Sequence, residues 1–287
     1  MYLLDTSALK AISGEKLRRA ITQYDIAIST LSVLELATHI NDSEDPEKYL
    51  RFRGNFVKCK IPRLLDDPFL LLSKKLSTAA NSTRVDEREV LLQLISKVEE
   101  SESLEILATK NLAFADGLTA TCKNVGSHLA EVMAEEERMY VDQIHLLART
   151  LKFDSPSAGH RELTSLNFVK ILRGAIGNPG SKKSFAEQAR NLFATSLYYG
   201  YLTSRLYFYA NKRILGQTEL SVDHNDCEDA YICLHLDLTE EIVLVTKDQG
   251  TLKAIGETLS ILNDIMPFDF SQEYVITVQE FVQRIEA

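Results

Sequence analysis

Short apolar runs alternate with helical spacing at the start of the 287-residue chain. The runs at 2–4 and 26–28 have the length and composition of buried strands. A helical stretch over 6–12 lies between them and is ended by Gly14, and Ser32 is placed to cap a second helix that carries Glu35. Residues 1–40 therefore predict the order strand, helix, strand, helix, which is typical of a parallel sheet.

The end of the chain resumes the same alternation. Its predicted elements are two helix-strand pairs and a closing helix, at 227–238, 242–246, 250–255, 274–277 and 278–285. Two half-sheets that are far apart in sequence must meet to bury their faces. We therefore expect both ends of the chain to form one α/β domain.

The middle of the chain is different, because its apolar residues recur every three or four positions, as in amphipathic helices. One stretch, 56–61, alternates apolar residues with lysines and is compatible with a strand. We predict a discontinuous α/β domain formed by residues 1–80 and 215–287, interrupted by a mostly α-helical insertion over 81–214.

The formal net charge of −9 hides an uneven distribution. Residues 48–84 carry nine basic and two acidic residues, and 160–220 carry nine and three, whereas 221–287 carry fourteen acidic and three basic residues. Basic and acidic blocks alternate, as they would around an acidic metal site that lies in a cleft for a polyanion.

No secretory or membrane-spanning segment is evident in the sequence. There is no run of about 18 apolar residues, and the N-terminus lacks a basic region followed by a long apolar one. We expect a cytoplasmic protein without a membrane partner. The four cysteines are scattered without a CxxC pair, so we assign them neither metal binding nor disulfides.

Four acidic residues occupy positions where the predicted fold would gather them. Asp5 follows the first strand, and Asp248 follows the strand over 242–246. Glu35 lies on the helix after the second strand, and Asp229 lies on the helix before 242–246. Ligands collect at the carboxyl ends of parallel strands, so we expect these four side chains to converge.

Converging carboxylates repel one another, and the usual resolution is a hard cation. A ligand set of oxygen atoms without His or Cys suits Mg²⁺ or Mn²⁺ rather than zinc. Such an ion lowers the pKa of a bound water molecule and stabilises an in-line phosphoryl displacement. The chemistry that these residues predict is phosphodiester hydrolysis. Taken singly, each acid is more simply explained as a helix cap or as a partner of the helix dipole.

Five short segments, taken together, resemble the PIN-domain family. They are YLLDTSAL at the start, ISTLSVLELA, EDAYICLHL, IVLVTKD and the ending VITVQEFVQRI, and they occur in the family's order. The resemblance covers residues 1–40 and 221–287, whereas the middle of the chain has no equivalent that we recognise. It implies a metal-dependent ribonuclease fold with a central parallel sheet.

The resemblance also implies roles for single residues. Asp5 and Asp248 would bind the metal directly, and Glu35 and Asp229 would complete the cluster. The family's hydroxyl positions correspond to Ser7 and Thr246, which would bond a carboxylate or a bound water. Asp226, one helical turn before Asp229, is an alternative or additional ligand. We prefer Asp229, because the segment DAYICLHL follows the family's helix pattern more closely.

Basic side chains in two segments are candidates for contact with nucleic acid. Lys182 and Lys183 lie in the loop GNPGSKKS, and Arg205, Lys212 and Arg213 lie on a tyrosine-rich stretch. Single strands are commonly gripped by aromatic rings beside cations. A buried helix seam or a dimer interface is the alternative interpretation of the same tyrosines.

We therefore predict a Mg²⁺- or Mn²⁺-dependent nuclease that acts on nucleic acid, with RNA favoured over DNA as the substrate. One alternative is a non-catalytic PIN-like scaffold that binds nucleic acid or protein. Another is a toxin ribonuclease of a toxin-antitoxin pair. Family members often associate, so a homodimer is also expected, and a protein partner fits both alternatives.

Overall fold

The structure is a computed structural model of the chain. It describes residues 1–42, 45–75, 87–110, 185–216, 225–265, 270 and 272–287, together with the single positions 138, 142 and 146.

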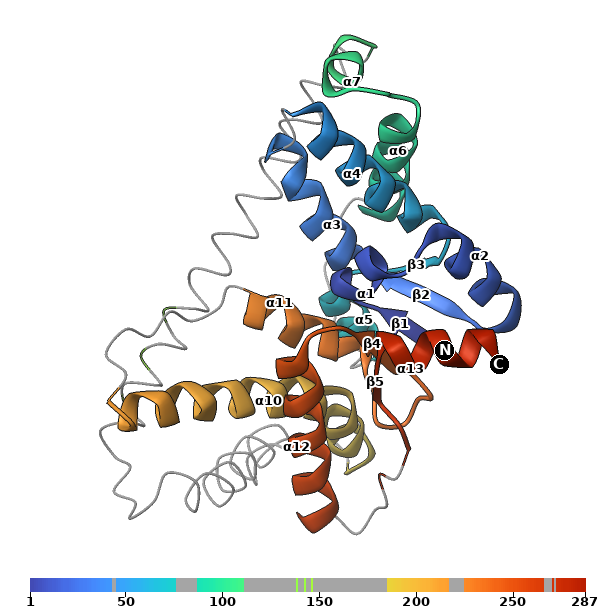
Figure 1. The fold of residues 1–287 in the computed structure, drawn as a ribbon. Helices are drawn as coiled ribbons and strands as arrows, with labels where there is room; N and C mark the ends of the chain where they lie inside the picture. The colour runs from blue at the N-terminus through green and yellow to red at the C-terminus, as the bar shows by residue number, and fades with distance from the viewer. Residues whose placement is uncertain are drawn as a thin grey trace.

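Five parallel strands form one sheet in these residues, in the order β3-β2-β1-β4-β5 (Figure 1). The strands are β1 (Tyr2–Leu4), β2 (Ile26–Ser29), β3 (Arg63–Leu65), β4 (Val243–Thr246) and β5 (Val275–Thr277). β1 pairs with β2 on one side and with β4 on the other, so that Leu4 stands beside Val245. The two ends of the chain therefore meet in one sheet, and the predicted α/β fold with a parallel sheet is confirmed.

Helices connect the strands in the N-terminal half of the sheet. Between β1 and β2 are α1 (Thr6–Ala11) and α2 (Gly14–Gln23). Between β2 and β3 are α3 (Thr30–Thr38), η1 (His39–Asp42), α4 (Pro46–Val57) and η2 (Lys58–Lys60), and α5 (Pro68–Lys75) follows β3.

Helix α3 begins earlier than predicted. Its cap is Ser29, whose Oγ accepts a hydrogen bond from the Leu31 N–H over 3.2 Å. Ser32, the predicted cap, is a buried residue inside the helix. The prediction was wrong because both serines precede apolar residues, and β2 runs directly into the helix without a loop. Glu35 consequently lies in the second turn of α3 rather than in the first.

The stretch over 56–61 is not a strand. Phe56 and Val57 end α4, and Lys58–Lys60 form a 3₁₀ turn. The alternation of apolar residues with lysines competes with a helical pattern, in which the buried residues Tyr49, Phe52, Phe56 and Cys59 recur every three or four positions. The helical pattern determines the structure, and the edge strand β3 follows at Arg63.

The remaining helices come from the middle and the end of the chain. They are α6 (Glu87–Glu99), α7 (Leu104–Lys110), α10 (Phe185–Ile214), α11 (Asn225–Ile232), η3 (Cys233–His235), α12 (Gln249–Ile265) and α13 (Val278–Glu286). Helix α12 continues ten residues beyond the predicted end at Ile255.

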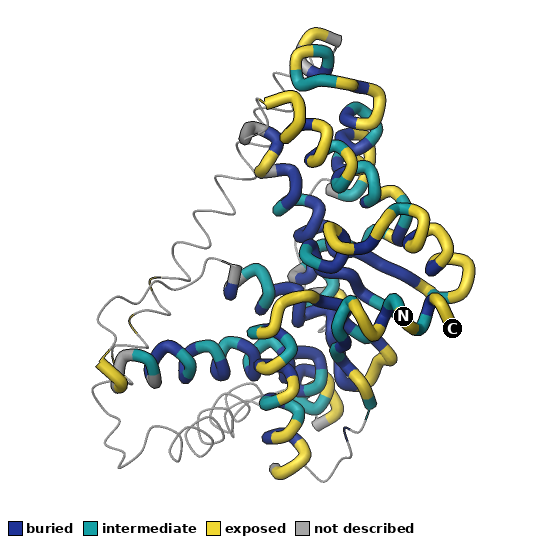
Figure 2. Tube along the Cα trace, viewed as in Figure 1, coloured by how far each residue is buried: buried dark blue, intermediate teal, exposed yellow. Residues whose placement is uncertain are grey.

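Successive residues of the buried strands supply two different hydrophobic cores, because side chains alternate between the faces of a sheet. Leu4 and Val245 belong to the core that includes α1, α2, α3, α4, α6 and α13. Leu3 and Leu244 belong to the core that includes α10, α11 and α12. The strands are accordingly buried between two helical layers (Figure 2).

Parts of the predicted insertion contribute to both cores. Leu94 and Val98 of α6 pack in the first core, and Leu197 and Tyr201 of α10 pack in the second. The described helices of this region therefore lie directly against the α/β layers. In the described part of the chain, no helix is both long and apolar enough to cross a membrane.

Candidate functional site

The candidate site lies at the carboxyl ends of β1 and β4, which are neighbours in the sheet. Asp5 directly follows β1, and Asp248 follows β4 by two residues. Because parallel strands end at the same edge, both residues lie at one edge of the sheet, next to the pair formed by Leu4 and Val245.

Asp5 is buried, with 3% of its surface exposed, and neutral donors surround its carboxylate. The Ala8 N–H donates to Oδ1 over 2.6 Å, which makes Asp5 the cap of α1. The Ser7 hydroxyl lies 2.9 Å from both carboxylate oxygens. The pKa of Asp5 is raised to about 6, chiefly by burial and also by the nearby charge of Glu35, although the bonds from Thr246, Ala8 and Ser7 oppose the rise.

Thr246 connects Asp5 with Asp248. Its hydroxyl donates to Asp5 Oδ2 over 2.5 Å and accepts from the Asp248 N–H over 2.9 Å. Ser7 reaches the same loop, because its Oγ accepts from the Lys247 N–H over 2.9 Å. The two hydroxyls suggested by the resemblance therefore lie beside Asp5 and fix the loop that carries Asp248.

Asp248 is exposed and sits at the start of α12. Its Oδ1 accepts from the Thr251 N–H over 2.6 Å, as a helix cap does. Asp5 and Asp248 thus both cap helices, as the simpler interpretation of such acids predicts. Their position at one sheet edge is an additional property that capping does not require.

Asp229 is not explained by capping, because it lies inside α11. Its Oδ2 accepts from the Thr251 hydroxyl over 2.9 Å and from the Tyr201 hydroxyl over 3.2 Å. The pKa of Asp229 is raised to about 8, chiefly by burial and also by the charges of Asp5 and Asp248. Three carboxyl groups from separate segments therefore interact electrostatically.

Glu35 approaches the cluster from α3 on the other side of Asp5. Its Oε2 accepts a hydrogen bond from the Thr6 hydroxyl, and its Oε1 lies 3.9 Å from Lys10 Nζ. The negative charge of Glu35 is one of the causes of the raised pKa of Asp5. Glu35 thus interacts electrostatically with Asp5, which in turn interacts with Asp229.

Asp226 has a different environment from Asp229. Arg205 Nε lies 2.7 Å from its Oδ1 in a largely buried ion pair, and the Tyr209 hydroxyl donates to its Oδ2 over 2.7 Å. Asp229 has no ion pair among the described residues. The carboxylate without a local cation is therefore Asp229, which agrees with the preference drawn from the sequence.

Of the five basic residues proposed for nucleic-acid contact, two have described side chains, Arg205 and Lys212. Arg205 is committed to Asp226, and Lys212 Nζ lies 4.3 Å from the centre of the Phe208 ring. The backbone of Arg213 belongs to α10, but its side chain is not described, and Lys182 and Lys183 lie outside the described residues. Of the tyrosines on this helix, Tyr201, Tyr207 and Tyr209 are buried, as the helix-seam alternative predicts.

Sequence reasoning missed three residues that hold the acids in place. Thr6 directly follows Asp5, but its hydroxyl donates to Glu35, 29 positions away. Thr251 follows Asp248 by three positions, but its hydroxyl donates to Asp229, 22 positions away. Tyr201 contacts Asp229 from another helix, 28 positions away, and no local pattern signals such a contact.

The donor set suits a hard cation in its chemistry, since it consists of carboxylate and hydroxyl oxygens. Burial is the largest cause of the raised pKa values of Asp5 and Asp229, and neither carboxyl group forms an ion pair among the described residues. In the described ranges, however, no three His, Cys, Asp or Glu side chains are grouped so that they would hold a metal ion together.

Comparison of the chain with models of protein families, with characterised proteins and with solved structures gave no match. The resemblance to the PIN-domain family accordingly rests on the five sequence segments alone.

Proposed function

We propose that the protein is a Mg²⁺- or Mn²⁺-dependent nuclease that hydrolyses phosphodiester bonds, with RNA as the substrate, and that it is a PIN-like domain. The observation that carries the proposal is the environment of Asp229. This carboxyl group is half-buried, feels the charges of Asp5 and Asp248, and has no ion pair among the described residues. A cation bound there would offset the repulsion between Asp229 and the carboxylates of Asp5 and Asp248, which the capping hydrogen bonds of those two residues do not relieve.

Asp5, Asp229, Asp248 and Glu35 would hold the ion. When bound, it would supply Lewis-acid activation of water and neutralise charge on the phosphate. Thr246 and Ser7 orient the Asp5 carboxylate, and Thr251 and Tyr201 orient Asp229. Asp248 is exposed, so its side chain is free to turn towards a cation.

Lys10 and Lys247 provide positive charge near the acids. Lys10 lies beside Glu35, and the exposed Lys247 stands between Thr246 and Asp248 in the chain. These lysines would attract the phosphate backbone and hold it near the acids, as phosphate contacts position a nucleic acid without reading its sequence.

A non-catalytic scaffold is the second candidate. It is favoured by the lack of a ready-made group of three metal ligands among the described residues. In that case Asp229, whose pKa is raised to about 8, would serve as a protonated hydrogen-bonding group near neutral pH, and Asp5 would serve as a helix cap.

Cleavage and metal binding separate the two candidates. We expect the wild-type protein to bind Mn²⁺ in calorimetry and to cleave a pool of labelled RNAs. Asp5→Asn should lose at least about 100-fold in cleavage and retain the fold, because asparagine also caps helices well. Asp25→Asn is the matched control, since Asp25 is exposed and pairs only with Arg63 among the described residues. Cleavage retained by Asp5→Asn would refute the nuclease.

A further inference from the structure

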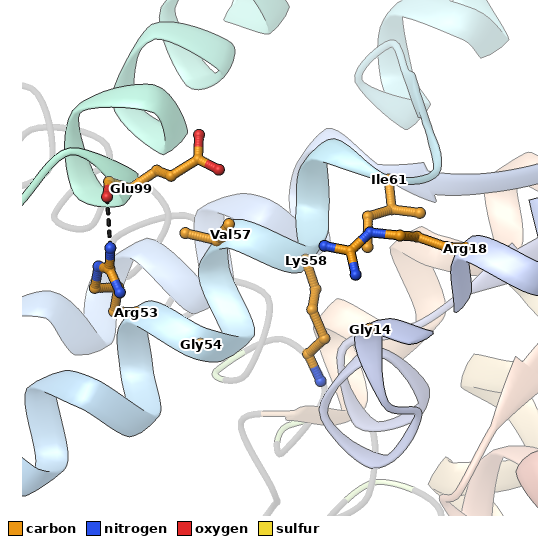
Figure 3. A pocket seen from close by; sticks show the side chains of 8 residues that line it. All are labelled: Gly14, Arg18, Arg53, Gly54, Val57, Lys58, Ile61 and Glu99. Carbon is orange, nitrogen blue, oxygen red and sulfur yellow. Dashed lines mark hydrogen bonds between the residues drawn. The ribbon is translucent and has the colours of Figure 1, made fainter. Parts of the chain in front are cut away.

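A second site lies outside the carboxylate cluster, in a pocket of about 370 Å³ (Figure 3). It opens between the start of α2, the end of α4 and the end of α6. The residues that matter for its chemistry are Gly14, Arg18, Arg53, Gly54, Lys58 and Glu99. Its volume lies within the range of small-ligand pockets.

Positive charge dominates this pocket. Arg18, Lys58 and Arg53 line it (Figure 3). Glu99 is its one acidic lining residue among the described residues, and it forms an ion pair with Lys60. In the described residues no carboxylate forms an ion pair with any of these three cations. An anion that entered the pocket would meet charge that the protein itself leaves uncompensated.

The cations are held in place by backbone carbonyls. Lys58 Nζ donates to the carbonyls of Leu9, Lys10 and Ile12 over 2.6, 3.3 and 3.0 Å. These three bonds use all its donors, so Lys58 contributes charge to the pocket rather than hydrogen bonds. Arg53 donates to the carbonyls of Val98 and Glu99 over 3.3 and 2.6 Å through Nε and Nη2, so that Nη1 remains for another acceptor. Arg18 has no hydrogen bond or ion pair in the described part of the chain. The pocket thus combines two fixed cations with one that is free to close on a ligand.

Two glycines keep the pocket open. Gly54 lies inside α4, where glycine is less favourable than alanine, and its φ is not positive. A Cβ at Gly54 would meet no atom within 4 Å, so packing does not require glycine. A Cβ at Gly14 would lie 3.9 Å from atoms of both Arg18 and Lys58. Both glycines line the pocket, so a side chain at either position would occupy part of its space.

We propose that this pocket binds a phosphate group. Arginine forks match the oxygens of phosphate. Gly14, which lines the pocket, is also the first residue of α2, and the N-terminal end of a helix favours an anion. The phosphate would come either from a free mononucleotide or from a nucleic-acid strand. The second source rests on the proposed nuclease function.

The geometry of α1 relates the pocket to the carboxylates. Asp5 caps the first turn of α1, and Lys58 binds the carbonyls at its last turn. Six residues of helix span about 9 Å, which corresponds to roughly three stacked nucleotides of one strand. A strand that is cleaved at Asp5 could therefore place another phosphate in the pocket.

The test compares Gly54→Leu, which fills the pocket, and Arg18→Gln, which removes its free cation, with the wild-type protein. Gly256→Leu and Arg51→Gln are the matched controls. Gly256 is also a helical glycine with no atom within 4 Å of its Cβ position, and Arg51 is an exposed arginine of α4. Both pocket variants should fold, because leucine favours helices and Arg18 is exposed.

The probes are adenosine monophosphate and inorganic phosphate in calorimetry at low salt, and a labelled RNA oligonucleotide without divalent metal. If the wild type binds the monophosphate and both variants weaken binding by about tenfold or more, the ligand is a free mononucleotide. If only the affinity for RNA falls by that factor, the ligand is the strand. Unchanged affinity for every probe in both variants, or loss that is equal in the controls, would overturn the proposal. Cleavage by the wild type and its loss in Asp5→Asn test the nuclease separately.

Discussion

Thr246 and Asp5 share a hydrogen bond of 2.5 Å although 241 positions separate them in the chain. The bond exists because β1 and β4 are neighbours, so the residues at their carboxyl ends meet. The same hydroxyl accepts from the Asp248 N–H. Thr246 therefore helps to set the relative position of Asp5 and Asp248, together with Ser7, which binds Asp5 and the Lys247 N–H.

Thr246→Val tests this dependence. Valine keeps the shape of the buried side chain but removes its hydroxyl, so Asp5 loses a donor and its pKa should rise further above about 6. We expect Mn²⁺ affinity and cleavage to fall about 10- to 100-fold, as for other groups that orient metal ligands. The optimum pH for cleavage should shift upward. Calorimetry and a pH profile of the rate would measure these effects.

Thr258→Val is the control for this substitution. Thr258 is equally buried, but its hydroxyl donates only to the Ala254 carbonyl of its own helix. Its replacement should leave metal affinity and the pH profile unchanged. If Thr246→Val behaves like Thr258→Val, the threonine bridge does not orient the site.

Asp229 predicts a specific dependence of stability on pH without metal. Its pKa is about 8 in the folded protein and near 3.8 when unfolded, so the folded state binds the proton more tightly. Its contribution to stability is fully present below pH 4 and is lost as the pH rises to 8. Across that window the free energy of unfolding should fall by up to about 1.4 kcal/mol per pH unit for this group.

Denaturant unfolding in EDTA between pH 4 and 9 would measure the slope. Asp229→Asn should flatten it, because asparagine does not titrate. Mn²⁺ should restore stability mainly above pH 7, where the carboxylate is ionised and available as a ligand. Parallel curves for the wild type and Asp229→Asn would show that this carboxyl group is not perturbed.

Much of this site was predictable from local sequence, because its parts are strand ends. The buried run over 242–246 and the start of the chain both read as strands, and a parallel sheet brings the residues after them to one edge. The strand pattern therefore predicts that Asp5 and Asp248 lie at the same edge of the sheet. Prediction failed where two local patterns competed, as at Ser29 and Ser32, or at residues 56–61, where helical spacing overrode alternation.

The contribution of α10 to the site was not predictable in the same way. Its tyrosines are compatible with a core, an interface or a surface that stacks on bases, and the outcome depends on which of them face the neighbouring helices. Tyr201 reaches Asp229 of α11 because its side chain is buried on the inner side of α10. Such a contact is set by tertiary packing and not by the spacing of residues along one segment.

Tyr201→Phe would test whether α10 supports the acids. The loss of the hydroxyl leaves Asp229 with one donor fewer, so its pKa should rise further and its affinity for Mn²⁺ should fall about tenfold. Tyr274→Phe is the control, since the buried Tyr274 hydroxyl donates to the Leu238 carbonyl. Equal metal affinity in both variants, measured by calorimetry, would limit Tyr201 to a role in packing.

Gly200 sets the distance between α10 and α12. A Cβ at this position would overlap the side chain of Thr258, so Gly200→Ala should force the helices apart and destabilise the protein by about 1–3 kcal/mol. Metal affinity should fall as well, because the neighbouring Tyr201 would move away from Asp229. The double variant Gly200→Ala/Thr258→Ala removes Oγ1 and Cγ2, the two closest of the overlapping atoms, and should recover part of the stability. Gly256→Ala should stabilise an open helical position. Denaturant unfolding measures all three, and a double variant no more stable than Gly200→Ala would contradict this close contact.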